Sequence, residues 1–285
     1  GFRSLDAFDM WKMTRSQRIT QPKPHEDINQ LWVDFLRDSP GSLIGFGAYW
    51  GPSSGRGKVF SRYMPWNELF RGCNYFYTYW GDTGATTLAH DLSMYDDLKI
   101  LMQEYAELKR GIGKMIHEAR RDHNGVALLY SIASIHHWQL SHSDVTSGRD
   151  YYRGGMQHQY RAWIAMLIDA VGTFRFVSYQ QLTEGKLMKD RFKLLVLPWS
   201  QALSPAEIEQ IKMFVKNGGT VLADMRPGVS DGHCKSYEAS PLDEVFGIAQ
   251  NTGSTELKSE WVKTPFGRHK EPAHLGRLET DPSLK

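Results

Sequence analysis

Residues 192–225 read FKLLVLPWSQALSPAEIEQIKMFVKNGGTVLADM and predict a strand, a helix and a second strand. KLLVLPW (193–199) is a continuous apolar run, typical of a strand buried on both faces. Ser204 and Glu207 have the spacing of a capping box, which places a helix start there. The apolar stripe of this helix recurs at intervals of three and four: Ile208, Ile211, Phe214 and Val215. A glycine pair then ends the helix before TVLADM, so the stretch is one unit of a parallel α/β sheet.

Two further strands and a helix extend this pattern toward the N-terminus. GVALLYS (125–131) and FRFVSY (174–179) are apolar runs of strand length. A helical pattern lies between them, from about Arg153 to Val171. Four buried strands that alternate with helices predict a doubly wound, three-layer domain with a parallel sheet.

The first part of the chain, to about Arg120, shows the same alternation. Strands are expected at LDAFDMW (5–11), SLIGFGAYW (42–50) and CNYFYTYWG (73–81). Three helices are expected with them. The first covers residues 25–39, and the second covers residues 65–72, with Pro65 in its first turn and Gly72 at its end; the apolar face of the first consists of Ile28, Leu31, Trp32 and Phe35. The third, longer helix is opened by Ser93 and Asp96, and its apolar stripe consists of Leu98, Leu101, Tyr105, Leu108, Ile112 and Met115.

The composition argues against several partner classes. The chain has 285 residues, of which 41% are hydrophobic and 23% charged, and its net charge of +2 is spread along the sequence. No charged field points to nucleic acid, and no apolar run reaches the roughly 18 residues that span a bilayer. Cys73 and Cys234 form no metal-binding pattern and leave the compartment open, with a soluble cytoplasmic protein favoured over a secreted one.

The sequence predicts no cofactor and no metal. Neither GxGxxG nor GxxxxGK[ST] occurs, which argues against a nucleotide site. Ser200 follows the strand at 193–199 without a GxSxG context, and neither cysteine stands at a strand end, so no nucleophile is visible in the doubly wound domain. The histidines form no HExxH or HxH pattern and are expected at the surface or an interface: His136, His137, His142, His158 and His233.

Aromatic residues close two neighbouring predicted strands and are the candidate ligand-binding groups. The chain contains 9 Trp, 13 Tyr and 13 Phe. Tyr49 and Trp50 end one strand, and Trp80 ends the next. The carboxyl ends of parallel barrel strands line active sites, and a sugar ring presents a flat C–H face to an aromatic ring. The pattern therefore predicts a carbohydrate-binding platform, and placement of Trp80 in the core stays open as the alternative.

Two carboxylates lie near the same strand ends. Asp82 follows Trp80, and Asp9 lies on the first expected strand. Both are candidate hydrogen-bond partners of a substrate, although an ion pair or a helix cap would explain either one. Glu68, inside an expected helix, is assigned a structural role.

Three motifs follow one another in the second half of the chain: LVLPxxxxLSxxE, FVxxGGTVxAD and RPGxxD. Together with residues 126–134, 157–172, 174–182 and 242–248, they resemble the β-galactosidase trimerisation domain. This is the flavodoxin- or class I glutaminase-like module that follows the catalytic barrel in family-42 glycoside hydrolases. The resemblance implies a homo-oligomer, with a trimer suggested, and a carbohydrate substrate.

The first half resembles the end of the barrel in the same enzymes. PWNELFRGCNYFYTYWG (65–81) is similar to the helix that leads into the eighth strand, with Trp80 where a sugar-stacking tryptophan is expected. YAELKRGIGKMI (105–116) is similar to the helix that leaves the barrel. The abrupt ends suggest a fragment of a longer protein. The resemblance implies three parts: residues 1–120 as the C-terminal part of a TIM-barrel-like glycosidase domain, 121–250 as the trimerisation-type flavodoxin-like domain, and the polar, irregular 251–285 as the start of a truncated following segment.

The catalytic residues are not assigned. Retaining glycosidases use two carboxyl groups about 5–5.5 Å apart. The resemblance places the acid/base on the fourth barrel strand, outside this chain, and the nucleophile on the seventh, LIGFGAYWG (43–51), which carries no glutamate. Either the strand assignment is shifted or this branch has altered or lost the chemistry.

Three hypotheses follow from these patterns. The leading one is a fragment of a β-galactosidase-like glycoside hydrolase of carbohydrate metabolism, inactive on its own. The alternative is a non-catalytic carbohydrate-binding or scaffold relative. The third, an amidotransferase- or hydrolase-like site in the doubly wound domain, is opposed by the missing nucleophile.

Overall fold

The computed structural model describes residues 9–15, 19–20, 29–39, 43–48, 57–78, 88–89, 91–119, 121–141, 156–250, 258–264, 267–273 and 279–280. The chain divides into two compact units. The first comprises Gly1–His123 and Tyr160–Ala170, and the second comprises Asn124–Gln159 and Val171–Lys285.

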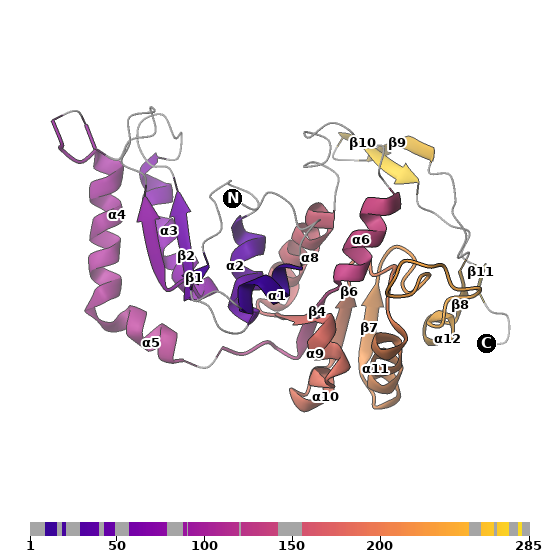
Figure 1. Ribbon diagram of the computed structural model, residues 1–285. Coiled ribbons are helices and arrows are strands. Elements are labelled where there is room, and N and C mark those ends of the chain that lie inside the picture. The colour runs from indigo at the N-terminus through magenta and orange to yellow at the C-terminus, as the bar shows by residue number, and fades with distance from the viewer. Residues whose placement is uncertain are drawn as a thin grey trace. The chain divides into compact units, whose positions relative to one another are not determined.

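The second unit is built on the four-stranded parallel sheet that the sequence predicts. Its strands are β4 (Val126–Tyr130), β5 (Arg175–Ser178), β6 (Leu194–Leu197) and β7 (Thr220–Ala223), in the order β5-β4-β6-β7 (Figure 1). β4 pairs with β5 on one edge and with β6 on the other, and all five of its side chains are buried. A strand covered on both faces needs an apolar residue at every position, which explains the unbroken run VALLY.

Helices follow the first three strands of this sheet. α6 (Ile132–Ser141) follows β4, α9 (Tyr179–Thr183) and α10 (Lys186–Lys189) follow β5, and α11 (Pro205–Lys216) follows β6. α8 (Met156–Val171), which lies within the predicted helical range, leads into β5 and has residues in both units.

The predicted capping box at the start of α11 is confirmed. The Ser204 hydroxyl accepts a hydrogen bond from the backbone N–H of Glu207, and Glu207 Oε2 accepts one from the backbone N–H of Ser204 at 2.8 Å. Pro205 occupies the first helical position, where its missing N–H has no partner to lose. A second capping box, between Ser178 and Gln181, starts α9.

The apolar stripe of α11 packs into the core of the second unit. It clusters with side chains of β4, β5 and β6. Three of its four predicted members are at most 2% exposed, namely Ile208, Ile211 and Phe214, whereas Val215 is half-buried. α11 ends at Lys216, and Gly219 lies in the turn into β7. A Cβ at Gly219 would lie 2.4 Å from the Phe214 ring, so only glycine fits there without rearrangement.

The C-terminal part of the second unit contains strands that the sequence analysis did not expect. α12 (Asp243–Phe246) precedes β8 (Ile248–Ala249), which pairs with β11 (Glu279–Thr280). β9 (Lys258–Thr264) and β10 (Gly267–Ala273) form an antiparallel pair. The irregular structure expected for residues 251–285 is therefore wrong for these strands, because polar residues in a paired ribbon leave no apolar pattern to detect.

The first unit contains a smaller parallel sheet. Its strands are β1 (Ile19–Thr20), β2 (Leu43–Ala48) and β3 (Tyr75–Thr78), in chain order. The helices are α1 (Met10–Arg15), α2 (Asn29–Asp38), α3 (Gly57–Arg71), α4 (Asp96–Glu107) and α5 (Gly113–Glu118). α3 packs against α4 (Figure 1). Trp11 of α1 meets Phe35 of α2 edge to face, and both rings are 1% exposed, so this pair joins the two helices.

Three local predictions in the first unit are wrong. α1 replaces the C-terminal part of the strand expected at 5–11, and among the described residues the first strand is β1. α3 starts at Gly57 and holds Pro65 in its interior, although proline removes one helical hydrogen bond. Ser93 does not cap α4, because its hydroxyl donates to Asp91 Oδ1 at 2.6 Å, and Tyr95 is the N-cap residue. The end of α3 at Gly72, which has φ of +104°, is as predicted.

The long helical stripe of the first unit is partly confirmed. Leu98, Leu101 and Leu108 are at most 6% exposed, but Met115 is 63% exposed. The backbone of Gly111, with φ of 138°, is not helical, so a kink within Leu108–Ile112 separates α4 from α5. The helix direction changes at this kink, so the apolar stripe of α4 does not continue onto α5.

Loss of the Ser204 hydroxyl should weaken the second unit. Ser204→Ala leaves the N–H of Glu207 without its capping partner, and we expect the free energy of unfolding to fall by about 1 kcal/mol. Urea denaturation followed by circular dichroism measures the change. Ser236→Ala, at an exposed serine outside any helix, is the matched control and should change stability by less than about 0.5 kcal/mol. Equal stability of both variants would contradict the assigned role of the cap.

Candidate functional site at the carboxyl ends of β2 and β3

The predicted ligand-binding groups follow two strands that lie side by side. β2 and β3 are parallel neighbours, and Ala48 lies opposite Thr78 in their register. Both strands therefore end at the same edge of the sheet. Four of the predicted site residues lie outside the described residues, so the aromatic platform stays a prediction: Tyr49, Trp50, Trp80 and Asp82.

Asn74 sets the register that brings these two strand ends together. Its side-chain Oδ1 accepts a hydrogen bond from the backbone N–H of Ile44 at 2.8 Å, and its own N–H donates to the Ile44 carbonyl at 2.7 Å. This double contact fixes the start of β3 against β2. Nothing in the sequence distinguishes Asn74 from an ordinary turn residue, and the analysis missed it.

Asp9, the fifth predicted site residue, caps a helix. Its Oδ1 accepts a hydrogen bond from the backbone N–H of Lys12 at 3.2 Å, and Oδ2 lies 3.8 Å from the ammonium group of Lys12. Its own carbonyl accepts from Met13 N–H in the first turn of α1. The strand position assigned to Asp9 was wrong, and the alternative role considered for it, a cap with an ion pair, is the one observed.

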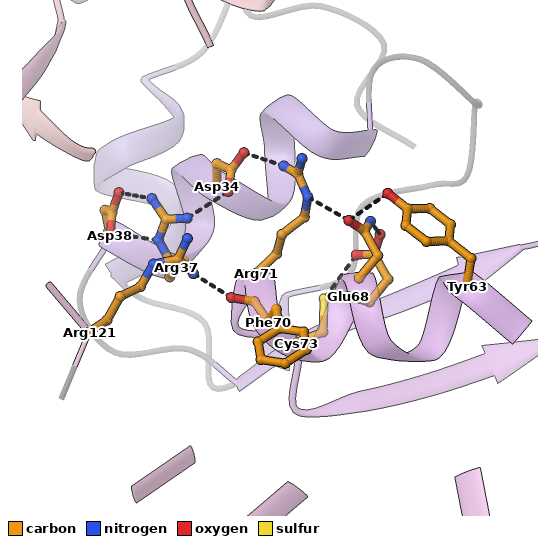
Figure 2. Close-up of polar contacts among 10 residues, drawn as sticks. Asp34, Arg37, Asp38, Tyr63, Glu68, Phe70, Arg71, Cys73 and Arg121 are labelled. Carbon is orange, nitrogen blue, oxygen red and sulfur yellow. Dashed lines mark hydrogen bonds and ion pairs between the residues drawn. The ribbon is translucent and has the colours of Figure 1, made fainter. Parts of the chain in front are cut away.

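A buried cluster of charges joins α2 to α3 in the first unit. Figure 2 shows Asp34 between two arginines. One oxygen of Asp34 lies 2.6 Å from Arg37, and the other accepts from Arg71 of α3. Arg37 also pairs with both oxygens of Asp38. Burial alone would lower the pKa of Arg37, but Asp38 and Asp34 outweigh it and raise that pKa, so the guanidinium stays charged.

Arg121 attaches the segment after α5 to the end of α3. Its Nη1 donates to the Phe70 carbonyl at 2.6 Å (Figure 2). Burial and the positive charge of Arg37 lower the pKa of Arg121 to about 10, which leaves it protonated at neutral pH. The contact satisfies one of the carbonyl groups at the C-terminal end of α3, which lack a partner within the helix.

Glu68 lies on the buried face of α3 beside Cys73 (Figure 2). Its Oε2 accepts a hydrogen bond from the Cys73 thiol at 3.3 Å, and Oε1 accepts one from the Asn67 amide at 3.0 Å. Burial raises the pKa of Glu68 to about 7. Burial and the Glu68 charge in turn raise the pKa of Cys73, so the thiol is unreactive. Glu68 is 4% exposed and both of its carboxylate oxygens accept hydrogen bonds, which agrees with a structural role.

The sequence could have predicted only part of this arrangement of buried charged side chains. Met64, Glu68 and Leu69 share a helical face, so the periodicity of α3 could have placed Glu68 inside. Asp34 lies between the buried residues Val33 and Phe35. Its arginine partner Arg71 comes from a distant helix, and no local pattern identifies such a pair.

The carboxyl edge of the second unit offers no activated nucleophile at the positions tested. Ser200 is fully buried and donates its hydroxyl to the Pro198 carbonyl at 3.2 Å. The residue at the positive φ of 41° after β6 is Trp199, whose N–H donates to Asp224. Burial, with the charge of Asp231, raises the pKa of Cys234. These findings agree with the absence of a nucleophile motif.

Neither a metal centre nor a membrane-spanning helix is found in the described part of the chain. Within the described ranges, no group of three or more His, Cys, Asp or Glu side chains could hold a metal ion. No helix in that part of the chain is long and apolar enough to cross a bilayer.

Residues 124–271, more than half of the chain, match the family model described as the β-galactosidase trimerisation domain. The chain belongs to this family. The trimerisation-domain match covers the four parallel strands and extends to β10, so it confirms the resemblance carried by the three motifs. A comparison with curated proteins finds no match.

Solved structures of GH42 enzymes share the fold of this chain over most of its length. A β-galactosidase from G. stearothermophilus has a TM-score of 0.65 at 18% identity, over 92% of this chain and 40% of its own length. A β-galactosidase from Bacillus circulans sp. alkalophilus has a TM-score of 0.64 at 16% identity, over 91% and 42%. An exo-carrageenase GH42 from Bacteroides ovatus has a TM-score of 0.55 at 14% identity, over 81% and 34%.

These similarities show a shared fold. The mixed α/β architecture with parallel sheets is that of GH42 enzymes over most of the chain. The chain spans about two fifths of the length of the two β-galactosidases that it matches.

Replacement of Arg71, which pairs with the buried Asp34, should destabilise the first unit. In Arg71→Met the Asp34 carboxylate, 2% exposed, keeps only Arg37 as a partner. We expect a loss of about 1–3 kcal/mol in unfolding free energy, because a buried charge is left under-satisfied. Lys99→Met, which breaks an exposed pair with Asp96, is the control and should cost less than about 1 kcal/mol. A control loss equal to that of Arg71→Met would contradict the assignment.

Glu68 should make the first unit less stable as pH rises. The folded-state pKa, about 7, lies above the reference value of 4.5, so the folded state binds the extra proton between these values. Its contribution to stability is full below about pH 4.5 and is lost as the pH rises through about 7. The loss is on the order of 3 kcal/mol. Urea denaturation from pH 5 to 8 should show this slope, and Glu68→Gln should flatten it. An unchanged slope in Glu68→Gln would rule out Glu68 as its source.

Proposed function

We propose that the chain is part of a β-galactosidase-like glycoside hydrolase of the GH42 type, and that the second unit assembles the protein into a homotrimer. The observation that carries the proposal is the order of its parts. A parallel α/β segment is followed by a trimerisation-type domain, and together they cover one continuous likeness to GH42 β-galactosidases over 92% of the chain.

The domain boundaries belong to this proposal. Residues 1–120 would form the C-terminal part of a TIM-barrel-like domain, supported by three adjacent parallel strands with helices between them. Residues 121–250 would form the flavodoxin- or class I glutaminase-like domain. The support for this is the strand order β5-β4-β6-β7, which is 2-1-3-4 when the strands are numbered along the chain. Flavodoxin-like folds have the order 2-1-3-4-5. Residues 251–285 would begin a following segment.

The substrate would be a carbohydrate held at the shared edge of β2 and β3. Trp80, Trp50 and Tyr49 would supply aromatic faces, and Asp82 a hydrogen-bond acceptor. Asp9 is left out of this site because its carboxylate caps α1. Hydrolysis by this family of folds needs two carboxyl groups, and those groups would come from parts of a longer protein. The reaction therefore belongs to the proposal for the whole enzyme, of which this chain matches about two fifths.

A β-galactoside is the preferred substrate of the proposal. Two of the three GH42 structures described above are named β-galactosidases, while the third is named an exo-carrageenase. The fold thus accommodates more than one glycoside, and the side chains at the strand ends would determine which glycoside is bound.

The 285-residue chain alone should not hydrolyse a nitrophenyl β-galactoside. The segment LIGFGAYWG (43–51) carries no glutamate, and the resemblance places the acid/base on a strand outside this chain, so we expect the carboxyl pair that the reaction needs to be incomplete. A chromogenic assay at saturating substrate tests the absence of hydrolysis. Separately, light scattering measures the mass of the protein in solution and should detect the expected trimer. Turnover that a single substitution abolishes would contradict the first expectation, and a monomer at all concentrations would contradict the second.

Trp80→Ala should weaken sugar binding without unfolding the chain. Loss of a stacking ring costs about 1 kcal/mol, which corresponds to roughly a fivefold to tenfold higher Kd for methyl β-galactoside by titration calorimetry. Tyr63→Ala, at an exposed aromatic residue on α3, is the control and should leave Kd unchanged. A collapsed melting transition in Trp80→Ala would place this indole in the core and remove it from the site.

A further inference from the structure

The second unit contains a cavity of about 350 Å³ at the carboxyl ends of its parallel strands. Ile132 and Ala133, at the start of α6, form one wall after β4. Tyr179, at the start of α9, lies after β5, and Pro205 of α11 comes after β6. Ligands of open α/β sheets bind at this edge, beside the point where the strand order reverses, and the volume is at the small end of ligand pockets.

Glu207 provides an unused acceptor at this cavity. Its side chain lines the cavity and is 3% exposed. Oε2 accepts from the N–H and the hydroxyl of Ser204 in the capping box, whereas Oε1 is buried and has no hydrogen-bond partner among the described residues. A buried acceptor without a partner is unfavourable, so a hydrogen bond from a ligand donor to Oε1 would stabilise the complex. Burial, opposed by the hydrogen bonds from Ser204, also raises the pKa of this carboxyl.

The rim of the cavity adds a second carboxylate and an imidazole. Asp231 Oδ1 accepts backbone hydrogen bonds from His233 and Lys235, each at 2.9 Å, which lower the pKa of Asp231 and hold it ionised. His233 lines the same rim and is exposed. Acceptors therefore outnumber charged donors around the opening, and most of the remaining lining surface is apolar.

This combination selects against charged ligands. An anion would meet two carboxyl groups. A cation would meet the N-terminal ends of α6 and α11, where the helix dipoles are positive. A neutral molecule with several hydroxyl groups avoids both penalties, because its O–H groups donate to carboxylates and its C–H faces pack on proline and aromatic rings.

We propose that this cavity is a binding site for a neutral polyhydroxylated molecule of the size of one sugar ring, with Glu207 Oε1 and Asp231 as acceptors and Pro205 and Tyr179 as apolar walls. The site lies wholly within the second unit. It is independent of the proposed sugar platform at β2 and β3.

Titration calorimetry of the 285-residue chain with D-galactose, D-glucose and myo-inositol tests the proposal. At least one of them should bind saturably, and Glu207→Gln should raise its Kd at least tenfold. Glutamine can still serve in the capping box, so this variant replaces the free acceptor with an amide donor without removing the cap. Ala133→Met, which fills the cavity and removes no polar group, should have the same effect. Glu209→Gln, exposed two residues along α11, is the matched control and should bind as the wild type does.

Several results would overturn the proposal. Binding that survives both Glu207→Gln and Ala133→Met would lie elsewhere, and loss of that binding in Trp80→Ala would assign it to the platform. If none of the three probes binds up to its solubility limit, the cavity is not a binding site for this class of molecule. Saturable binding of inorganic phosphate that competes with the sugars would show an anion site instead. Unchanged melting temperatures of the variants are the check that each remains folded.

Discussion

The second unit depends on the burial of one strand. The five side chains of β4 are at most 4% exposed, and its two edges pair with β5 and β6. A backbone in such a place can satisfy its N–H and C=O groups only through neighbouring strands. The parallel direction then follows from the helical connections, and it brings the carboxyl ends of all these strands to one edge. The cavity and the starts of α6, α9 and α11 lie at that edge as a consequence.

The first unit is held together differently. Apolar contacts, such as that of Trp11 with Phe35, join α1 to α2, but α2 is joined to α3 by the buried ion pairs of Asp34. Buried ion pairs add little net stability because desolvation offsets the attraction, yet the loss of one partner is costly. Such a cluster favours a single arrangement of the helices that carry it. It thereby helps to position the sheet at whose edge the candidate sugar platform is predicted.

The two units also differ in how they bear on function. The family assignment rests on the second unit, whose motifs and matched segment coincide. The proposed chemistry rests on the first, where β2 and β3 end side by side and where the aromatic residues follow in sequence. The likeness to GH42 structures connects the two units, because it extends over 92% and 91% of the chain.

The sequence by itself determined the parallel sheet of the second unit and the start of α11. VALLY, LLVL and the Ser204–Glu207 box are local signals, since burial on both faces demands unbroken apolar runs and a helix start demands a nearby acceptor. It was less successful in the first unit, where Pro65 was taken for a helix start and Asp9 for a strand residue. These signals are ambiguous, because proline is favoured in the first helical turn but, as at Pro65, also occurs inside a helix despite the lost hydrogen bond.

Only the tertiary structure decided the contacts that join distant segments. Arg71 meets Asp34, Asn74 sets the register of β2 and β3, and Glu207 comes to line a cavity bounded by residues of three other segments. The physical reason is that hydrogen bonds and ion pairs depend on distance and direction in space. Local periodicity records which face of an element is buried, but it carries no information on which distant side chain that face will meet.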